Sequence, residues 1–459
     1  MAPARHGSPP ASRKADATAA ALRACRTIGG FGRAWRLPLP PLSDFVNPSP
    51  ASAAATRMTA GERRASASLA AVFAARMLGL FLVLPVFALE AARYPGGTDP
   101  ALIGMAMGIY GLTQGLLQIP YGLASDRFGR KRVIVLGLAV FALGSLLGVW
   151  APTLHWLVVA RAVQGAGAIS AAVTALLADQ TRDVVRTKAM AMVGVSIGLM
   201  FAVSLVAAPA AAAHIGLSGL FAVTGVLAVL CMAAIGWWTP PEPRVHASVP
   251  RGRVADVLGL PALVRLNVGV FVLHAVQLAM WVALPALLVR AGLAKADHWK
   301  IYLPAVLASF VVMGSTLFPL ERRGYLRAMF LASIALVGLV QLGLALVAPH
   351  AGLAALAVLL FLFFCGFNVL EATQPSLASR LAPPQARGTA MGIYNTLQSL
   401  GLFAGGAVGG WLSKHVGMAG LFAACAGMMV VWLVVAWPMR APGRPASAED
   451  LLAEEAQAT

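Results

Sequence analysis

Long runs of apolar residues recur from about residue 68 to residue 437, and they constrain the fold more than any other feature. Each run approaches the ~20 residues that an α-helix needs to cross the ~30 Å hydrocarbon core of a bilayer. Only 11% of the residues are charged, against roughly 25% in soluble domains. We therefore predict an all-α integral membrane protein. Its twelve transmembrane helices are expected at residues 68–90, 101–122, 133–151, 154–178, 189–213, 217–238, 266–290, 300–320, 326–348, 352–378, 389–412 and 418–437.

The net charge of +18 would suggest a nucleic-acid partner in a soluble protein, but the basic residues follow the predicted membrane topology instead. If the first span leads outward, the inward loops hold Arg127, Arg130, Lys131 and Arg132 and further arginines after spans four, six, eight and ten. Positive loops stay on the cytoplasmic side. We therefore expect an inner-membrane protein with both termini in the cytoplasm and no nucleic-acid partner.

The two ends of the chain differ from the spans. Residues 1–64 are rich in Ala, Pro, Ser and Arg without an apolar period, so we expect a disordered extension. It resembles a transit peptide in being rich in Arg and poor in acidic residues. Alternatively, Met58 is the native start, because it stands just before the first span. Residues 441–459 are expected to form a short cytoplasmic tail.

Two similar halves are indicated by internal repeats. A predicted cytoplasmic linker at residues 239–264 separates a six-helix bundle at 65–238 from another at 265–440. Residues 125–130 are echoed 195 positions later, and residues 186–191 are echoed 201 positions later. Small residues at matching spacing in spans five and eleven give a third echo, and such residues let helices approach closely in lipid. Two bundles of this kind are a known transporter plan.

The stretch GLASDRFGRK at residues 122–131 resembles the loop signature of the major facilitator superfamily, and RAVQG at 161–165 resembles its second signature. Span five is similar to the antiporter signature of the family, with Ser or Ala in place of each glycine. RMLGLFLVLPVFAL, HWKIYL and FNVLEATQPSL resemble the YajR-type branch of drug:proton antiporters, without its C-terminal soluble domain. The resemblance implies two pseudo-symmetric six-helix bundles.

The signature loop is expected to act as a conformational latch. In the family, its aspartate faces the N-terminal end of span eleven in the other half, where a carboxylate is stabilised by the helix dipole. An arginine of the loop is also expected to pair with the acidic residue at the inner end of span four. The predicted latch consists of Gly122, Asp126, Arg127, Gly129, Arg130 and Asp179.

Ionisable residues deep in a span usually face a cavity or a partner, because burying them in lipid is costly. Arg76, His274 and Glu371 share one depth, roughly 10 to 14 Å from the cytoplasmic edge at 1.5 Å per residue. We expect Glu371 to carry the proton, with His274, Arg76 and Arg161 assisting. The alternative for Glu371 is a structural role, either in a permanent ion pair with Arg76 or in hydrogen bonds across helices. Glu90, near the outer end of span one, is expected to lie at a solvated rim.

The resemblance places spans one, four, seven and ten around a central cavity. Amide side chains on these spans and on span two are expected to face the substrate. They are Gln114, Gln118, Gln164, Gln277, Asn368 and Gln374.

These features predict a proton-coupled transporter that exports small, fairly apolar compounds by alternating access and acts as a monomer. A carrier of a sugar or organic anion is the main alternative, with Arg76 as anion site; a membrane enzyme and a sensor on a transporter fold are others. No nucleophile elbow, phosphate loop, metal cluster or cysteine framework is present in the sequence, so we expect no catalytic residues, metal or cofactor.

Overall fold

Long α-helices dominate the computed structural model, which describes residues 58–242, 254–350, 352–383 and 386–439. Residues 1–57 of the predicted extension, the C-terminal tail and part of the linker lie outside those ranges. The expectation of disorder was wrong for residues 60–64, which begin the first helix after a capping box formed by Thr59 and Glu62. The elements are α4 (Ala60–Ala91), α5 (Pro100–Phe128), α6 (Arg130–Val149), α7 (Leu154–Ala166), α8 (Ser170–Asp179), α9 (Asp183–Ala233), η1 (Ala234–Trp238), α10 (Val254–Leu258), α11 (Pro261–Arg290), η2 (Lys295–Asp297), α12 (Trp299–Arg322), α13 (Leu326–Val347), α14 (Leu353–Leu381), α15 (Arg387–His415) and α16 (Gly417–Ala436).

These helices account for the twelve predicted spans. Within the described residues, ten helical stretches are long and apolar enough to cross a membrane, and α7 and α8 count there as one. The longest stretch, Lys188–Trp238, contains two spans, because Gly216 has a non-helical backbone with φ 64° and ψ −171°. The eleventh span, α15, is not among these stretches, because it is long but rich in glycine.

The fourth span is broken partway along. α7 ends at Ala166 and α8 begins at Ser170. A helix end leaves backbone carbonyl groups without helical partners, and Arg76 donates a hydrogen bond of 3.3 Å to the carbonyl oxygen of Gly167 in this break. The sequence predicted one continuous helix here, so the break is a finding of the tertiary structure.

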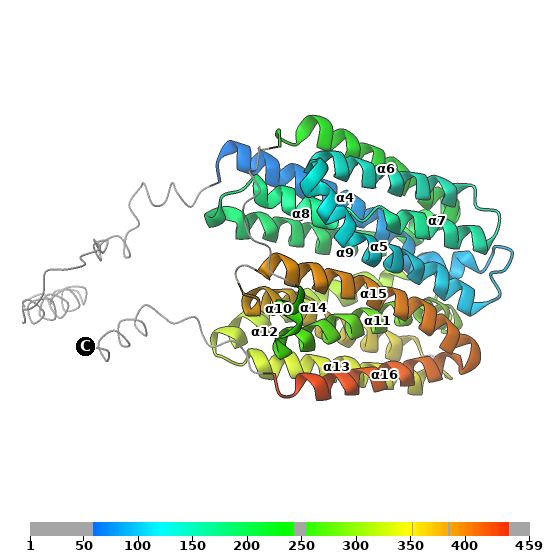
Figure 1. Ribbon diagram of the computed structural model, residues 1–459. Coiled ribbons are helices and arrows are strands. Elements are labelled where there is room, and N and C mark those ends of the chain that lie inside the picture. The colour runs from blue at the N-terminus through cyan, green and yellow to red at the C-terminus, as the bar shows by residue number, and fades with distance from the viewer. Residues whose placement is uncertain (1–57, 243–253, 351, 384–385, 440–459) are drawn as a thin grey trace, which may run out of the picture. The chain divides into compact units, whose positions relative to one another are not determined.

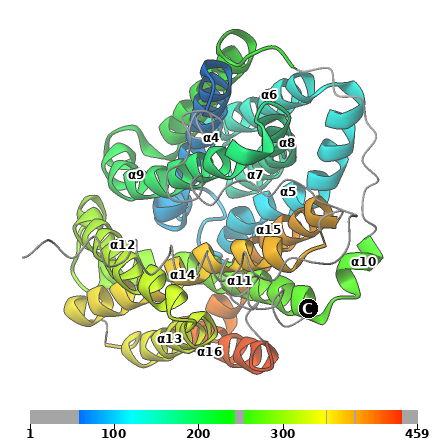
Figure 2. The ribbon, with the colours of Figure 1, turned by 90° about the vertical axis from the view of Figure 1, so that its left-hand side faces the viewer.

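The helices form two groups, with α4 to α9 in one and α11 to α16 in the other, and Figure 1 and Figure 2 show them in two views turned by 90°. In the N-terminal group, α4 packs along α9, α5 packs against α7, and α6 packs against both α7 and α9. In the C-terminal group, α13 packs against α14 and α16, and α11 packs against α15. The most extensive contact between the groups joins α5 to α15, with smaller contacts between α4 and α11 and between α9 and α12.

Glycines on α15 allow this helix to pack closely on two sides. Gly401, Gly405 and Gly409 face α11, whereas Gly406 and Gly410 face α5. A Cβ added at Gly406 would lie 2.6 Å from a backbone oxygen of α5, so the helix backbones touch directly. Such small-residue faces permit close helix packing in lipid, and this face joins the two halves.

The two halves also share a backbone conformation at equivalent connections between helices. Gly129 lies between α5 and α6 with φ 99°, and Gly324 lies between α12 and α13 with φ 85°. Glycine adopts positive φ without steric cost. The two glycines therefore make the same sharp connection at equivalent places.

Candidate transport site

Three polar side chains from three helices meet inside the C-terminal half. Nε2 of His274 on α11 lies 3.4 Å from Oε2 of Glu371 on α14. Gln398 on α15 places its amide nitrogen 2.7 Å from the same His274 nitrogen and 3.4 Å from Oε1 of Glu371. His274 Nδ1 lies 2.9 Å from the carbonyl oxygen of Val270, which orients the ring.

The accessibility of the two ionisable groups differs. The Glu371 side chain keeps 40% of its surface exposed, whereas His274 keeps 5%. Glu371 is therefore the more accessible of the two groups, and His274 is the buried one. Among the described residues, Oε2 of Glu371 lacks a hydrogen-bond donor, whereas Oε1 accepts from Gln398.

Arg76 is held within the N-terminal half. It is 2% exposed and donates to the Tyr110 hydroxyl at 3.0 Å, to Ser170 Oγ at 3.4 Å and to Gln114 Oε1 at 3.4 Å. Together with the carbonyl of Gly167, these acceptors fasten α4 to α5 and to the break between α7 and α8. The alternative in which Arg76 forms an ion pair with Glu371 is not what the structure shows.

Arg161 lies in a second buried polar cluster of the same half. Its guanidinium donates to Gln164 Oε1 at 3.0 Å and stacks over the Tyr110 ring at 4.7 Å. Gln164 in turn donates to Ser145 Oγ at 2.8 Å, and Thr224 donates to the same oxygen at 3.1 Å. Within the described residues, neither Arg76 nor Arg161 has a carboxylate in ion-pair range, and both contact Tyr110.

The six predicted cavity amides take different positions. Gln114 connects Arg76 to α15 by donating to Ser399 Oγ at 3.2 Å, and Gln164 belongs to the Arg161 cluster. Asn368 donates to a serine on α12 at 2.8 Å, and Gln277 is half-buried on α11. The two remaining amides are buried and lack hydrogen-bond partners among the described residues: Gln118 and Gln374.

The signature loop gathers its charges around the start of α6. Arg130 forms ion pairs with Asp126 and, at 3.1 Å, with Asp179, so Arg130 rather than Arg127 reaches the end of α8. Glu242, at the start of the linker, accepts from the backbone N–H groups of Arg130 and Lys131. We call this end of the bundle the loop end.

The remaining predicted latch residues lie close by. Arg127 places its guanidinium 5.5 Å from the centre of the exposed Phe128 ring. Gly122 approaches α8, where an added Cβ would meet only Ala171 at 3.7 Å. Gly129 adopts the positive φ described above and adjoins Glu242.

Two ion pairs join the halves at the opposite end, which we call the distal end. Glu90 pairs with Lys295, and Asp99 pairs with Lys414 at 2.9 Å. Glu90 is 3% exposed, so the expectation of a solvated rim was wrong: the carboxylate is buried and pairs with Arg93 of its own half as well as with Lys295. The hydrogen bond from Lys414 holds the pKa of Asp99 below its usual range.

The comparisons with known proteins agree with this architecture. The sequence profile described as Major Facilitator Superfamily matches residues 69–406 and 319–458. The chain belongs to the major facilitator superfamily. It is therefore a multi-pass membrane transporter with the two-bundle fold of that family.

Curated relatives resemble the chain in sequence, and a solved structure resembles it in fold. The chain is 41% identical to the inner membrane transport protein YajR of Escherichia coli over 84% of its length and 85% of that protein. It is 27% identical to the multidrug resistance protein MdtH of Aeromonas salmonicida, over 75% of this chain and 86% of that one. The human organic anion transporter MFSD10 has a similar fold, with a TM-score of 0.62 at 16% identity. The match covers 82% of this chain and 100% of that one.

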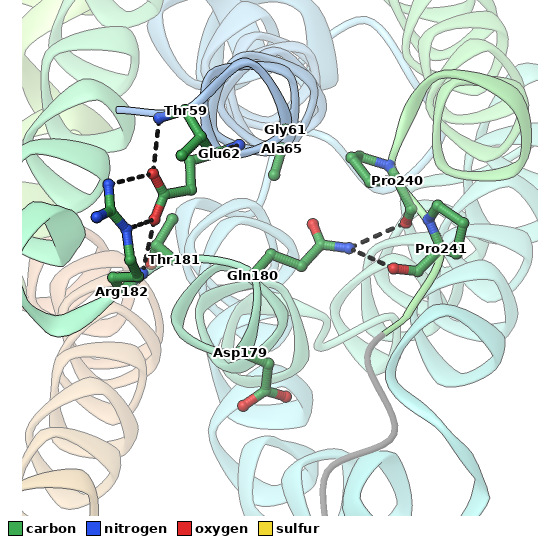
Figure 3. Close-up of a pocket in the computed structure, with 10 residues that line it drawn as sticks. All are labelled: Thr59, Gly61, Glu62, Ala65, Asp179, Gln180, Thr181, Arg182, Pro240 and Pro241. Carbon is green, nitrogen blue, oxygen red and sulfur yellow. Dashed lines mark hydrogen bonds and ion pairs between the residues drawn. The ribbon is translucent and has the colours of Figure 1, made fainter. Parts of the chain in front are cut away.

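A polar pocket of about 450 Å³ at the loop end of this transporter lies apart from the Glu371 cluster. In Figure 3, the Glu62 carboxylate accepts hydrogen bonds from the Arg182 guanidinium, and the Gln180 amide donates to the carbonyls of Pro240 and Pro241. The pair of Glu62 and Arg182, at 2.8 Å, raises the pKa of the guanidinium. The pocket joins the start of α4 to the turn after α8 and to the linker.

Sequence reasoning missed several residues of this arrangement. Gln398 and Ser399 stand in a predicted span without a distinctive pattern. Lys295 and Lys414 were visible as the few basic residues of the outer loops. Their positions opposite Glu90 and Asp99 offered a signal, since opposite charges in loops on the same side can pair.

Proposed function

We propose that this transporter exports small, fairly apolar compounds in exchange for protons. The observation that carries the proposal is the group of Glu371, His274 and Gln398. It places an accessible carboxyl without a permanent cation beside a titratable imidazole. The name of the MdtH relative, a multidrug resistance protein, points the same way.

The chemistry of the group suits proton exchange. A carboxyl surrounded by apolar helices favours its neutral form, and a nearby imidazolium favours the charged form. The proton therefore has two neighbouring positions with competing preferences, one on Glu371 and one on His274 Nε2. A change in solvent access at Glu371 would load or release the proton as the halves move.

The direction of transport follows from the orientation that we propose. Basic residues gather at the loop end, so we place this end and both termini in the cytoplasm of a cell with the transporter in its inner membrane. The distal end, where ion pairs and glycines close the halves together, then faces outward. The structure would represent an inward-facing state, and rocking of the two halves in one monomer would expose the site to the outside.

The organic-anion alternative depends on Arg76, and the contacts of Arg76 disfavour it. An anion site needs guanidinium N–H groups that are free to bind the ligand. In this chain Tyr110, Ser170, Gln114 and the Gly167 carbonyl already accept from Arg76, which is 2% exposed. We therefore assign Arg76 to holding α4 in place. We propose neither an enzymatic activity nor a cofactor.

Glu371→Gln is the variant that tests the proposal. The purified transporter would be placed in vesicles loaded with a pH-sensitive dye, and ethidium and other lipophilic compounds would be offered across an imposed pH gradient. We expect wild-type protein to move a compound against its gradient while protons move in the opposite direction. Loss of the ionisable carboxyl should reduce proton-coupled movement at least ten-fold, with counterflow of the compound retained.

Glu321→Gln provides the matched control. Glu321 is a carboxylate at the loop end that pairs with Arg380 at 3.0 Å within the same half, so its loss should leave coupling nearly unchanged. Equal coupling in the Glu371 variant and in the wild type would refute Glu371 as the proton carrier. Transport that ignores the pH gradient in wild-type protein would reject the antiporter itself.

A further inference from the structure

The hydrogen bonds of His274 determine which of its nitrogens titrates. Nδ1 lies 2.9 Å from the carbonyl oxygen of Val270, and a carbonyl only accepts, so Nδ1 carries a proton in both states of the ring. Nε2 is then the nitrogen that gains or loses a proton. That nitrogen faces both Glu371 and Gln398.

The amide of Gln398 fits only one protonation state in its present orientation. Its NH₂ group lies 2.7 Å from His274 Nε2, where it donates to the lone pair of the neutral imidazole. The same NH₂ group donates to Glu371 Oε1 at 3.4 Å, which favours the carboxylate. Once Nε2 is protonated, two donors would face each other, so the amide must turn its oxygen to the ring or move away.

Gln398 is also tied to the other half through its neighbour in sequence. Ser399 accepts a 3.2 Å hydrogen bond from Gln114 on α5, and Gln114 accepts from Arg76 at 3.4 Å. Adjacent residues on α15 therefore reach opposite ways, one to the titrating pair and one to the N-terminal half. The interface between α5 and α15 is also the most extensive contact between the halves.

We propose that Gln398 is a positioning residue that couples the protonation of His274 and Glu371 to α15. Its amide has two orientations, one for the neutral and one for the charged imidazole. Because Gln398 stands on α15, a change of orientation changes the hydrogen bonds of the helix that joins the halves. This inference rests on the proposed proton coupling. It adds a residue and a two-state element to that site.

The helices packed against α11 carry other titratable groups in their spans, among them Cys365 on α14, Tyr394 on α15, Cys425 on α16, Arg76 on α4 and Tyr110 on α5. Arg76 donates to the Tyr110 hydroxyl, and the Tyr394 hydroxyl is buried. Glu371 is the group in ion-pair range of His274.

Gln398→Met tests the inference, because methionine keeps the length of the side chain and removes the donor. Methionine cannot donate to the neutral imidazole or to the carboxylate, so both groups should hold a proton more tightly in this variant. We expect the midpoint of His274 to rise by roughly one pH unit, as a lost hydrogen bond of ordinary strength implies. Gln398→Glu, which only accepts when ionised, should raise it further.

The titration would be followed by NMR of histidine-labelled full-length protein in detergent, with the His274 signal assigned from His274→Gln. Gln341→Leu serves as control, since Gln341 is a buried amide on α13 without hydrogen-bond partners among the described residues. The pH profile of proton-coupled ethidium transport should shift in the same direction. An unchanged His274 midpoint in both Gln398 variants would overturn the inference, even if transport fell.

The design separates this inference from the proposed function. If wild-type protein shows no proton-coupled transport, the proposed function fails, whatever the NMR titration shows. If the wild type couples and the His274 midpoint stays fixed in the Gln398 variants, only the role of Gln398 fails. A variant that does not fold is recognised by the loss of its NMR spectrum, and the other Gln398 variant then decides.

Discussion

The distal end and the loop end of this transporter hold charges in different ways. At the distal end, Glu90 pairs with Lys295 and Asp99 with Lys414, and each pair joins one half to the other. At the loop end, Arg130 pairs with Asp179 inside the N-terminal half. The glycines of α15 show the same contrast along one helix.

Close packing is confined to the middle and distal part of α15. Added Cβ atoms at Gly406 and Gly410 would collide with the backbone of α5. At Gly388 and Gly392, near the loop end, they would meet no described atom within 4 Å. Rocking transporters need a contact that can form at either end in turn. The difference between the ends indicates that the distal contact is the one formed in this structure.

Gly406→Ala is expected to have the largest effect on this contrast. The new Cβ would lie 2.6 Å from backbone atoms of Gly104 and Gly108, which cannot move aside as a flexible side chain can. Overpacking of roughly 1–3 kcal/mol should reduce transport of ethidium into vesicles at least ten-fold. Gly392→Ala on the same helix is the control and should retain most of the activity. Equal loss in both variants would contradict the proposed difference between the ends.

Glu90→Gln should have the next largest effect, because it removes the charge that Lys295 meets across the halves. Losing one partner of a largely buried pair destabilises the contact that contains it. We expect the ratio of open to closed distal ends to rise five- to ten-fold, which corresponds to a free energy on the order of 1 kcal/mol. Spin labels at the exposed positions of Trp150 and Val416, in protein without native cysteines, would report a longer distance. An unchanged distance would show that this pair does not hold the halves together.

The smallest effect is expected from lowering the pH, because Asp99 then becomes protonated. Its pKa is lowered in the closed distal end by the hydrogen bond from Lys414. A lowered carboxyl pKa stabilises the closed state above the ordinary pKa of about 3.9, and this contribution is lost as the pH falls through the lowered value. The same spin labels should therefore show no opening from Asp99 between pH 8 and 5, and slight opening below about pH 4. Asp99→Asn should remove that response, and a response retained in this variant would assign it elsewhere.

The sequence predicted the spans well because the hydrophobic effect acts locally along the chain. A run of apolar residues has to lie in lipid as a helix whatever its neighbours do. The boundary between spans five and six was expected between residues 213 and 217, where Gly216 leaves the helical conformation. The break at Gly167 was missed, because packing between helices decides it.

The candidate site was predicted only in part. Glu371 and His274 stood out because ionisable residues in apolar spans are costly, and their common depth followed from the helical rise. Gln398 carried no such signal, since a neutral amide is tolerated in many positions. Arg76 shared that depth, yet it turns to Tyr110 and Ser170 instead of to Glu371.

The sequence by itself determined that this protein is a twelve-helix membrane transporter with two related halves and a charged loop at one end. Composition, hydropathy and motif spacing carry that information in consecutive residues. Only the tertiary structure decided which polar groups meet, that Glu90 is enclosed, and that the distal end is closed. Those outcomes depend on contacts between helices hundreds of residues apart, where small differences in packing and charge select one arrangement among several of similar free energy.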